Sequence, residues 1–407
     1  MMPLQSLLIY YSVVLYLGFT KIHFCVFCKE YLFKLDIIKR LRKFRTLEVD
    51  VKNNEVLFVP LPGNSKLEQR IAALNKLADY IKFSDFISPK DKVAVKVHVG
   101  EVDNTTHISA DLMLPVVKKV KAEEAYPFLT ETSTLYPGPR SNAIGHLNLA
   151  YKHGFTPERT GAPFIMADGL MGNNEVKVEI PGKLYKSVNI AKDAVLADAF
   201  VIFSHPTGHI VSGLGACLKN LGMGLSTRKG KLKQHSSVKP SIVTDKCTFC
   251  QECMKWCPED CIIEKDGKAY IESEKCIGCG ECISVCKFGA VKFNYAIESV
   301  EIQKRIAEYA MGSVMNKRDK CLFINVLTDM TTECDCMGGN QKPVVPDVGI
   351  LASYDPVAID RATLDLTRKM NGKDLGEISK PNLNPFIQLE HAELIGLGSQ
   401  KYILKEV

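Results

Sequence analysis

The chain has little that would mark a secreted or a membrane-spanning protein. Its apolar N-terminal run covers residues 7–19 of 407, whereas a membrane-spanning helix needs about 20 apolar residues. The run has no basic segment before it and no small-residue cleavage site after it, so a signal peptide is not indicated. We expect a cytoplasmic protein with no membrane partner, unless this run acts as an anchor.

The first 48 residues also lack the pattern of a globular domain, which begins only near Val51. A basic stretch at residues 39–45 follows the apolar run and would suit the cytoplasmic flank of an anchor. Two interpretations of residues 1–48 stay open: a weak anchor, or an extension outside the fold. We favour the extension.

Net charge is also low, since 52 basic and 46 acidic residues give only +6. An excess this small and diffuse does not indicate a nucleic-acid partner. One segment, residues 199–244, nevertheless contains no acidic side chain while it carries six lysines or arginines and six glycines. It matches neither a P-loop nor a dinucleotide fingerprint, and it has no interleaved aromatic residues to stack on bases.

Glycine amides and lysine charges together suit a phosphate or a carboxylate. We therefore expect an anion site that involves Arg228 and Lys231. A flexible solvated loop and a docking surface for an acidic redox partner are the alternatives.

Cysteine is abundant: eight of the fifteen fall in two copies of the spacing C-x2-C-x2-C-x3-C. This is the bacterial pattern for two [4Fe–4S] clusters, in which the fourth cysteine of each copy serves the other cluster. The first cluster would be held by Cys247, Cys250, Cys253 and Cys286. The second would be held by Cys276, Cys279, Cys282 and Cys257. Thiols arranged for metal indicate a reducing compartment. Structural zinc sites and a disulfide framework are the alternatives, and the spacing disfavours both.

An alignment of the two copies assigns a ninth cysteine. Cys261 occupies the place that Ala290 fills in the second copy, so we expect it to pack rather than to bind iron. The single tryptophan, Trp256, adjoins Cys257, and we expect it to shield a cluster from water.

Apolar runs and helical stretches alternate along the rest of the chain. Strands are predicted at residues 55–60, 92–98, 127–130, 163–167, 199–204, 321–327 and 348–352. Helices are predicted at residues 67–83, 110–122, 141–153 and 355–367. This alternation predicts an α/β domain with a mostly parallel sheet, in two discontinuous parts at residues 51–240 and 297–407. Residues 241–296 would form an inserted bacterial two-cluster ferredoxin-like α+β domain.

Ligands of such sheets bind beyond the carboxyl ends of the strands. Polar or metal-capable side chains follow four of the predicted strand ends, which favours a binding crevice there. The candidates to act as proton donors or to hold a substrate are His98, Glu101, His205, His209, Lys219 and Asn220. Cys334 and Cys336 would hold a further metal ion or act as a redox thiol pair, with packing in a loop as the alternative.

Six segments of the chain recur in one order in a known family: His98-Val-Gly-Glu101, Ser204-His-Pro-Thr-Gly-His209, Gly215-Ala-Cys-Leu-Lys-Asn-Leu-Gly-Met-Gly224, Arg228-Lys-Gly-Lys231, Cys334-Asp-Cys336 and Ser353-Tyr-Asp-Pro-Val-Ala-Ile-Asp360. Together they resemble domain-of-unknown-function family 362, from about Val51 to the C-terminus. The members most similar to this chain also carry an inserted two-cluster ferredoxin domain. The resemblance implies iron–sulfur binding and a redox role, but no agreed reaction. The histidine-bearing glycine-rich loop is also faintly similar to nickel-dependent lactate racemases.

Three functions follow as hypotheses. The first is an electron-transfer module or oxidoreductase, which relays electrons from a soluble donor or acceptor protein to an anionic small molecule or a metal in the crevice. The second is an iron–sulfur protein for redox sensing or assembly, without turnover. The third is a metal-cofactor-dependent isomerase. The sequence names neither the substrate, the cluster potentials, the electron partner nor the oligomeric state.

Overall fold

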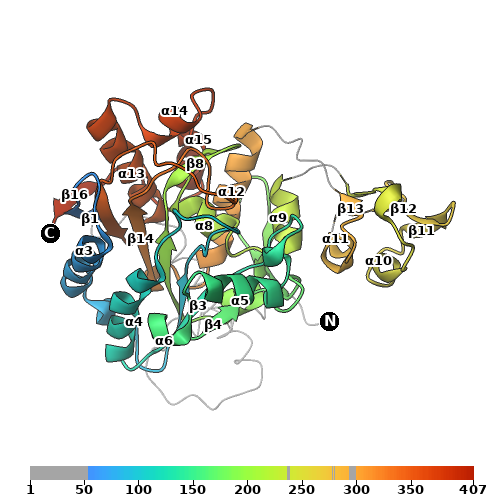
Figure 1. Cartoon of the computed structure of the whole chain (residues 1–407), viewed down its shortest axis with the longest axis horizontal. Helices are drawn as coiled ribbons and strands as arrows, with labels where there is room; N and C mark the ends of the chain where they lie inside the picture. The colour runs from blue at the N-terminus through green and yellow to red at the C-terminus, as the bar shows by residue number, and fades with distance from the viewer. Residues whose placement is uncertain (1–53, 236–238, 277, 279, 293–298) are drawn as a thin grey trace, which may run out of the picture. The chain divides into compact units, whose positions relative to one another are not determined.

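The computed structural model describes residues 54–235, 239–276, 278, 280–292 and 299–407 (Figure 1). By its internal contacts the chain divides into Met1–Asp50 and Val51–Val407. The predicted N-terminal extension, residues 1–48, lies outside the described residues, and so does Cys279. Everything described below belongs to the second part.

A central sheet has the strand order β16-β1-β15-β14-β7-β2-β3-β4. Every neighbouring pair is parallel except the two that involve β15. The strands are β1 (Glu55–Pro60), β2 (Lys92–Lys96), β3 (Tyr126–Glu131), β4 (Phe164–Met166), β7 (Ala199–Ser204), β14 (Cys321–Leu327), β15 (Gly349–Ser353) and β16 (Ile403–Glu406). The predicted α/β class with a mostly parallel sheet is confirmed.

One strand of this sheet, β16, is not predicted from the sequence. All of its residues are exposed, so it carries no buried apolar pattern. It is held at the edge of the sheet by parallel pairing with β1.

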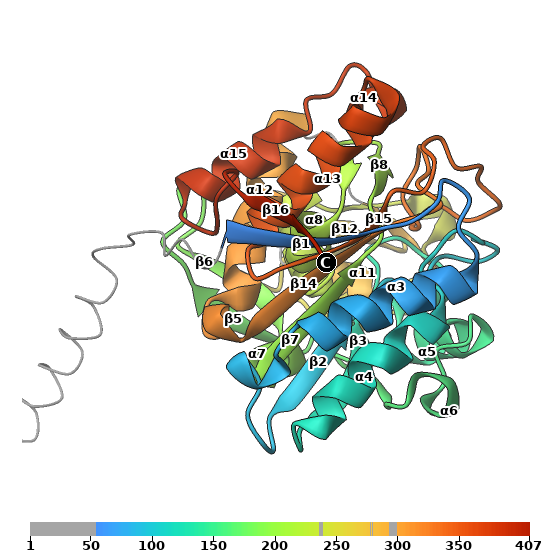
Figure 2. The same cartoon turned by 90° about the vertical axis from the view of Figure 1, so that its left-hand side faces the viewer.

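Helices cover both faces of the sheet (Figure 2). Along β2, Val93 and Val95 point into one hydrophobic core and Ala94 into the other, as the two-residue period of a strand requires. The first core is shared with α3 (Leu67–Tyr80) and α4 (Met113–Ala122). The second core is shared with α8 (Cys217–Gly222), α12 (Ser299–Val314), α13 (Pro356–Asn371) and α15 (Phe386–Leu394).

The helix α13 shows how local sequence sets these boundaries. The Asp355 carboxylate accepts hydrogen bonds from the N–H groups of Val357 and Ala358, at 2.7 and 3.0 Å, and a proline stands at the first helical position. Gly372 ends the helix in the left-handed conformation, with φ of 75°. The helix predicted at residues 355–367 therefore exists and continues to Asn371.

Residues 199–235 of the segment without acidic side chains are mostly buried in strands and helices, which argues against a flexible solvated loop there. It contains α8 and α9 (Arg228–His235), and its glycines let other backbone approach closely. A side chain at Gly222 would lie 2.4 Å from the Ile306 carbonyl oxygen, and one at Gly230 would lie 2.6 Å from that of Asn189. These glycines therefore serve packing, because no larger residue fits there.

Shorter elements complete the part of the chain around the sheet. The helices are α5 (Ala143–Lys152), α6 (Pro157–Thr160), α7 (Lys192–Leu196) and α14 (Leu375–Ser379). Two-stranded ribbons are formed by β5 (Glu175–Glu179) with β6 (Ser187–Ala191) and by β8 (Thr207–His209) with β9 (Gly213–Gly215).

The cysteine-rich segment, residues 241–292, lies between α9 and α12 in the chain. It begins on β10 (Ser241–Ile242) and ends on β13 (Val291–Lys292), and these two strands pair with each other. Between them lie β11 (Ile262–Lys265), β12 (Lys268–Ile271), α10 (Glu252–Lys255) and α11 (Glu281–Val285). The pairing of β10 with β13 lets the chain leave the α/β domain and return to it at one place.

Candidate functional site

A cavity of about 520 Å³ opens where β2, β3, β7 and β14 end. Most of the residues predicted for the crevice line it: His98, His205, His209, Lys219, Asn220, Lys231, Cys334 and Cys336. Because the carboxyl ends of parallel strands meet at one edge, segments far apart in sequence supply neighbouring walls. We call this cavity the crevice.

Two predicted residues do not line the crevice. Glu101 lies behind its wall, where its carboxylate accepts hydrogen bonds from Arg140 Nε at 3.1 Å and Tyr136 OH at 3.2 Å. Arg228 is buried and donates to the backbone carbonyls of Leu135, Ser141, Ile283 and Ser284.

Those carbonyls engage the two terminal nitrogens of Arg228, and Arg228 does not line the crevice, so the structure does not bring it to the predicted anion site. Only Lys231 of that pair faces the crevice.

Lys219 is the cationic partner of Cys336. Its Nζ lies 3.7 Å from Cys336 Sγ, and His98 Nε2 lies 3.4 Å from the same sulfur. A hydrogen bond from Cys334 lowers the pKa of Cys336 well below its usual value, and the Lys219 charge adds to this against the effect of burial. Burial opposes the charge of Lys219, but the neighbouring cysteines outweigh it and raise the pKa of Lys219. The arrangement is a thiolate–ammonium pair with a neutral thiol beside it.

This pair argues against the predicted metal site at Cys334 and Cys336, because an ammonium group stands where a cation would bind. Among the residues that the structure describes, no group of three or more His, Cys, Asp or Glu side chains is arranged to hold a metal ion.

Two of the three predicted histidines, His205 and His209, differ in their hydrogen bonds. His205 places Nδ1 at 2.8 Å from the Asp335 carboxylate and Nε2 at 2.7 Å from the Thr328 carbonyl oxygen. Burial disfavours a charged ring, but these two acceptors outweigh it and raise the pKa of His205. Both ring nitrogens of His205 are engaged, so it positions the Asp335 loop rather than a ligand.

His209 is instead held neutral. Its Nδ1 lies 2.7 Å from Ser212 Oγ and 3.1 Å from the Ser212 backbone nitrogen. Burial and then the Lys219 charge lower the pKa of His209 well below its usual value. His209 thus presents a neutral ring to the crevice.

Sequence reasoning passed over a buried network at the same strand ends. Lys96 Nζ lies 2.9 Å from Asn220 Oδ1 and 3.6 Å from Glu131, and Arg140 lies 3.6 Å from the same Glu131 oxygen. Burial lowers the pKa of Lys96. Burial also opposes ionisation of Glu131, but its basic neighbours, Lys96 among them, outweigh it and lower the pKa of Glu131. A lysine inside an otherwise apolar strand was the available signal, since a buried lysine needs a partner.

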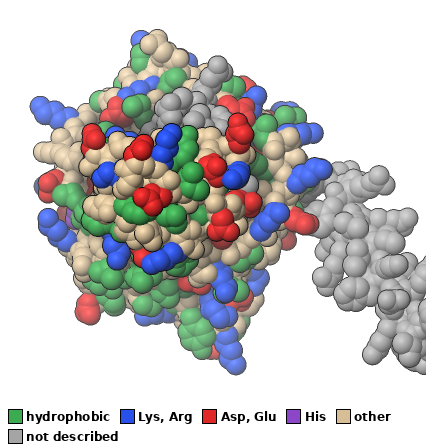
Figure 3. Space-filling model, turned by 90° about the vertical axis from the view of Figure 1, so that its right-hand side faces the viewer, with side chains coloured by type: hydrophobic (Ala, Val, Ile, Leu, Met, Phe, Trp, Pro, Cys, Tyr) green, Lys and Arg blue, Asp and Glu red, His purple; other side chains and the backbone are tan. Residues whose placement is uncertain are grey.

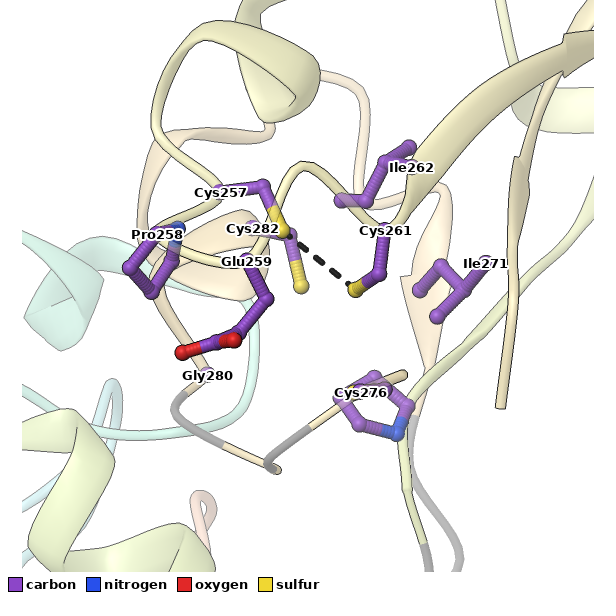
Figure 4. Close-up of a pocket in the computed structure, with 10 residues that line it drawn as sticks. Cys257, Pro258, Glu259, Cys261, Ile262, Ile271, Cys276, Gly280 and Cys282 are labelled. Carbon is purple, nitrogen blue, oxygen red and sulfur yellow. Dashed lines mark hydrogen bonds between the residues drawn. The ribbon is translucent and has the colours of Figure 1, made fainter. Parts of the chain in front are cut away.

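The cysteine-rich segment contains two small hollows lined by sulfur. Cys247, Cys250, Cys253 and Cys286 line one of them. Cys257, Cys261, Cys276 and Cys282 line the other, shown in Figure 4. The structure thus brings together the predicted first set and the described members of the second set.

Thiols in these hollows receive backbone hydrogen bonds, which a bound thiolate needs. The N–H groups of Ala269, Gly278 and Ala290 point at Cys247, Cys276 and Cys286, at 3.3–3.5 Å. Burial, followed by Cys286 and Cys247, raises the pKa of Cys253 to about 11. Several thiolates in one hollow therefore require a positively charged centre between them. The donor set fits iron–sulfur clusters, whose ligands are thiolates and whose sulfurs accept such bonds.

Cys261 also faces the second hollow. Its sulfur lies 3.4 Å from that of Cys257, and Figure 4 shows both pointing toward Cys282. Burial, followed by Cys257, raises the pKa of Cys261 to about 12, which favours a neutral thiol. Trp256 is 51% exposed and does not form the predicted shield.

A family comparison covers both sites. The family model described as "Domain of unknown function (DUF362)" matches residues 93–365, about two thirds of the chain. The chain belongs to this family. The matched region of the DUF362 chain contains every residue that lines the crevice and all of the cysteine-rich segment.

One curated protein matches a short piece of the DUF362 chain. It is the pyruvate synthase subunit PorD of Methanothermobacter marburgensis, which is 42% identical over 52 residues. The match covers 13% of the chain and 60% of that subunit, less than two thirds of its length.

Solved structures give only distant likenesses. The lactate racemase apoprotein from Thermoanaerobacterium thermosaccharolyticum aligns over 69% of the DUF362 chain and 52% of its own, with a TM-score of 0.36 and 11% identity. A Thermotoga maritima protein aligns over 79% and 60%, with a TM-score of 0.37 and 12% identity. Likenesses this distant carry no argument about function.

Within the described residues, every helix is too short or too polar to cross a bilayer.

Proposed function

We propose that the chain binds two [4Fe–4S] clusters in residues 241–292, as an inserted ferredoxin-like domain, and relays electrons to an anionic small molecule in the crevice. The observation that carries this proposal is the division of the cysteines between two hollows. Seven of the eight predicted ligands are described, and each lines the hollow that crossed ligation requires. The match to a pyruvate synthase subunit supports an iron–sulfur role.

The bound clusters would supply single-electron transfer. The chain would hold the first with Cys247, Cys250, Cys253 and Cys286, and the second with Cys257, Cys276, Cys279 and Cys282. Cys261 takes the place of Ala290, which is buried in the other copy, so it would remain a packing residue.

The helix α9 supports a relay because it touches both sites. Arg228 donates to the carbonyls of Ile283 and Ser284, next to Cys282, and Leu232 packs in the same small core as the cysteines. Lys231 and His235 of the same helix line the crevice. One helix, about 10 Å across with its side chains, therefore spans the interval between the second hollow and the crevice.

The charges of the crevice favour an anionic ligand. Lys96, Arg140, Lys219 and Lys231 line it or lie directly behind its lining. Lys96 and Arg140 share the carboxylate of Glu131, and Lys219 has the thiolate of Cys336. Lys231 donates to two neutral oxygens, those of Thr132 and Ser226, both at 2.6 Å. Burial lowers the pKa of Lys231 to about 8, although the charge of Asp168 opposes this.

Lys231 lines the crevice and its hydrogen-bond acceptors are neutral, so it would bind a carboxylate or phosphate. Residues such as Ile210 and Met223 add an apolar wall for the remainder of the molecule.

A soluble protein would exchange electrons with the clusters. On the face shown in Figure 3, acidic and basic side chains are interspersed, so no patch of one sign marks a partner on that face. Partner and cytoplasmic location remain predictions.

The test is to purify the protein without oxygen, measure iron and sulfide, and titrate the clusters by EPR. We expect about eight irons per chain and two reducible clusters. Cys257→Ala and Cys286→Ala should each remove one cluster and spare the other. Cys261→Ala is the matched control, since it lies four residues from Cys257 and should keep both. Zinc in place of iron, or loss of a cluster in Cys261→Ala alone, would contradict the ligand assignment.

Binding in the crevice is tested with the same protein. Inorganic phosphate and a set of small carboxylates are added, and the shift in melting temperature is measured. Lys231→Met should abolish the shift while the iron content is unchanged. Clusters that are reducible in a protein that binds no anion would favour redox sensing instead.

A further inference from the structure

The described residues contain one thiol pair that the cluster assignment does not use, Cys334 and Cys336. They lie on a turn closed by a hydrogen bond from the Met337 N–H to the Cys334 carbonyl oxygen, at 2.8 Å. Both thiols are free and both line the crevice. The pair is therefore open to a molecule in the crevice, unlike Cys217 and Cys321, which are buried in the α/β core.

The two cysteines lie close enough along the chain to bond to each other. They are two residues apart on one turn, and both line the same crevice. Residues two apart cannot have Cα atoms more than roughly 7.6 Å apart, and disulfides span about 4.4–6.8 Å. The turn brings the Cα atoms of Cys334 and Cys336 closer than an extended chain would. A disulfide between them therefore needs little movement of the backbone.

Groups from two other elements stabilise the reduced form. Lys219, on α8, points its ammonium at Cys336 Sγ, and His98, which follows β2, lies at 3.4 Å from it. A buried ammonium group stabilises a sulfur that carries negative charge. It would also repel a metal cation at the same place.

We propose that Cys334 and Cys336 form a reversible dithiol–disulfide couple, and that this couple is the group in the crevice that accepts and returns electrons. The couple rests on the proposed function only for the cellular source of its electrons, the reduced clusters. Its chemistry is that of a two-electron carrier beside two one-electron carriers.

The reaction balances within the chain. On reduction, the Cys334–Cys336 S–S bond breaks and takes up two electrons and one proton. Cys336 leaves as the thiolate opposite Lys219, and Cys334 takes the proton as a thiol. Oxidation is the reverse: the S–S bond forms, one proton leaves, and two electrons pass to the acceptor. With glutathione as the reactant, the disulfide and two glutathione molecules give the dithiol and one glutathione disulfide.

The first test equilibrates the anaerobic holoprotein in glutathione buffers of graded potential. Free thiols are then alkylated, and the peptide that carries both cysteines is analysed by mass spectrometry. We expect Cys334 and Cys336 to become blocked and unblocked together, with one two-electron midpoint, while Cys321 stays reduced throughout. Glutathione attached to either cysteine singly, or no change over the whole range, would overturn the proposal.

The second test counts electrons. Coulometric reduction of the oxidised holoprotein should take up about two more electron equivalents per chain in the wild type than in Cys336→Ser. Cys321→Ser is the matched control and should behave as the wild type. Lys219→Met should keep the disulfide but shift its midpoint to a more negative, more reducing potential, because the reduced form loses the ammonium opposite its thiolate.

The outcomes separate this couple from the proposed function. Two EPR-active clusters with no Cys334–Cys336 disulfide would sink the couple and leave the relay intact. A disulfide that forms in a protein without iron would leave the couple standing and remove the clusters as its electron source.

Discussion

The α/β part and the cysteine-rich segment differ in the interactions that stabilise each of them. The sheet has a hydrophobic core on each face, built from strands and helices far apart in the chain. The cysteine-rich segment has one small core, in which four of the thirteen buried residues are cysteines. Two more, Leu135 and Leu232, belong to the α/β part.

The difference concerns what each region needs in order to fold. Buried apolar area stabilises the sheet at about 25 cal/mol per Å², whatever the ligand state. About fifty residues with a core this small do not bury enough area alone, and such domains depend on metal or disulfides. We therefore expect the segment, but not the sheet, to depend on its clusters.

The largest expected effect follows from iron removal. When the clusters are stripped with a chelator under reducing conditions, amides of residues 241–292 should lose protection from hydrogen exchange by a factor of about 100 or more. Amides of β7 and β14 should keep theirs, because their partners are other strands. Mass spectrometry of peptides measures both regions in one sample. A segment that stays protected without iron would remove the distinction between the two regions.

The second prediction concerns a substitution that destabilises only the α/β part. The Glu308 carboxylate is buried and accepts the N–H groups of Lys183, Leu184 and Tyr185 at 2.6–2.8 Å, and it pairs with His391 at 3.0 Å. Glu308→Ala leaves these donors without an acceptor and should lower the free energy of unfolding by about 3–4 kcal/mol. Urea unfolding checks this, and iron content should not change.

The same residue gives a pH test. Burial opposes ionisation of Glu308, but His391 and the three amides outweigh it and lower its pKa. A lowered pKa means stability that is present above the unfolded value of 4.5 and is lost as the pH falls through the folded pKa. The difference in the free energy of unfolding between wild type and Glu308→Gln should therefore be largest at pH 7 and should decrease below about pH 4.5. A constant difference would mean that Glu308 is not ionised in the fold.

The sequence predicts the sheet better than it predicts the site. Buried strands such as β7 and β14 are continuous apolar runs, and such runs are visible without any neighbour. The strand-end rule likewise finds His209 and Lys219. It does not predict that Glu101 lies behind the crevice wall, and the glycine-rich basic pattern does not predict that Arg228 turns away from the crevice, because the direction of each side chain depends on neighbours contributed by other segments. Arg140 escapes notice for the same reason: its carboxylate partners, Glu101 and Glu131, precede it by 39 and 9 residues, across an intervening strand and turn.

A third, smaller effect concerns the junction between the two regions. Arg228→Gln removes the charge and most of the hydrogen bonds to the carbonyls of Ile283 and Ser284. We expect a loss of about 2 kcal/mol in stability and a more negative potential for the second cluster, since a cation near Cys282 favours the electron. Arg228→Lys, which keeps the charge, is the control for the potential. EPR titration that finds equal potentials in Arg228→Gln and wild type would contradict the placement.

The smallest effect separates the regions by the direction of their response to pH. Cluster ligands must be deprotonated, so the cysteine-rich segment should lose iron as the pH falls. The His205–Asp335 pair behaves in the opposite way, because the pKa of His205 is raised in the fold. A raised pKa means stability that is fully present below the unfolded value of 6.5 and is lost as the pH rises through the folded pKa.

The variant Asp335→Asn isolates the stability that the His205–Asp335 pair contributes. It should cost about 1 kcal/mol near pH 6 and progressively less as the pH rises through the folded pKa of His205. The ring ¹⁵N shifts of His205 should move its pKa toward 6.5 in the variant. The free energy of unfolding and the iron content could instead fall together as the pH changes in one direction. The two regions would then share one titrating group and would not be independent.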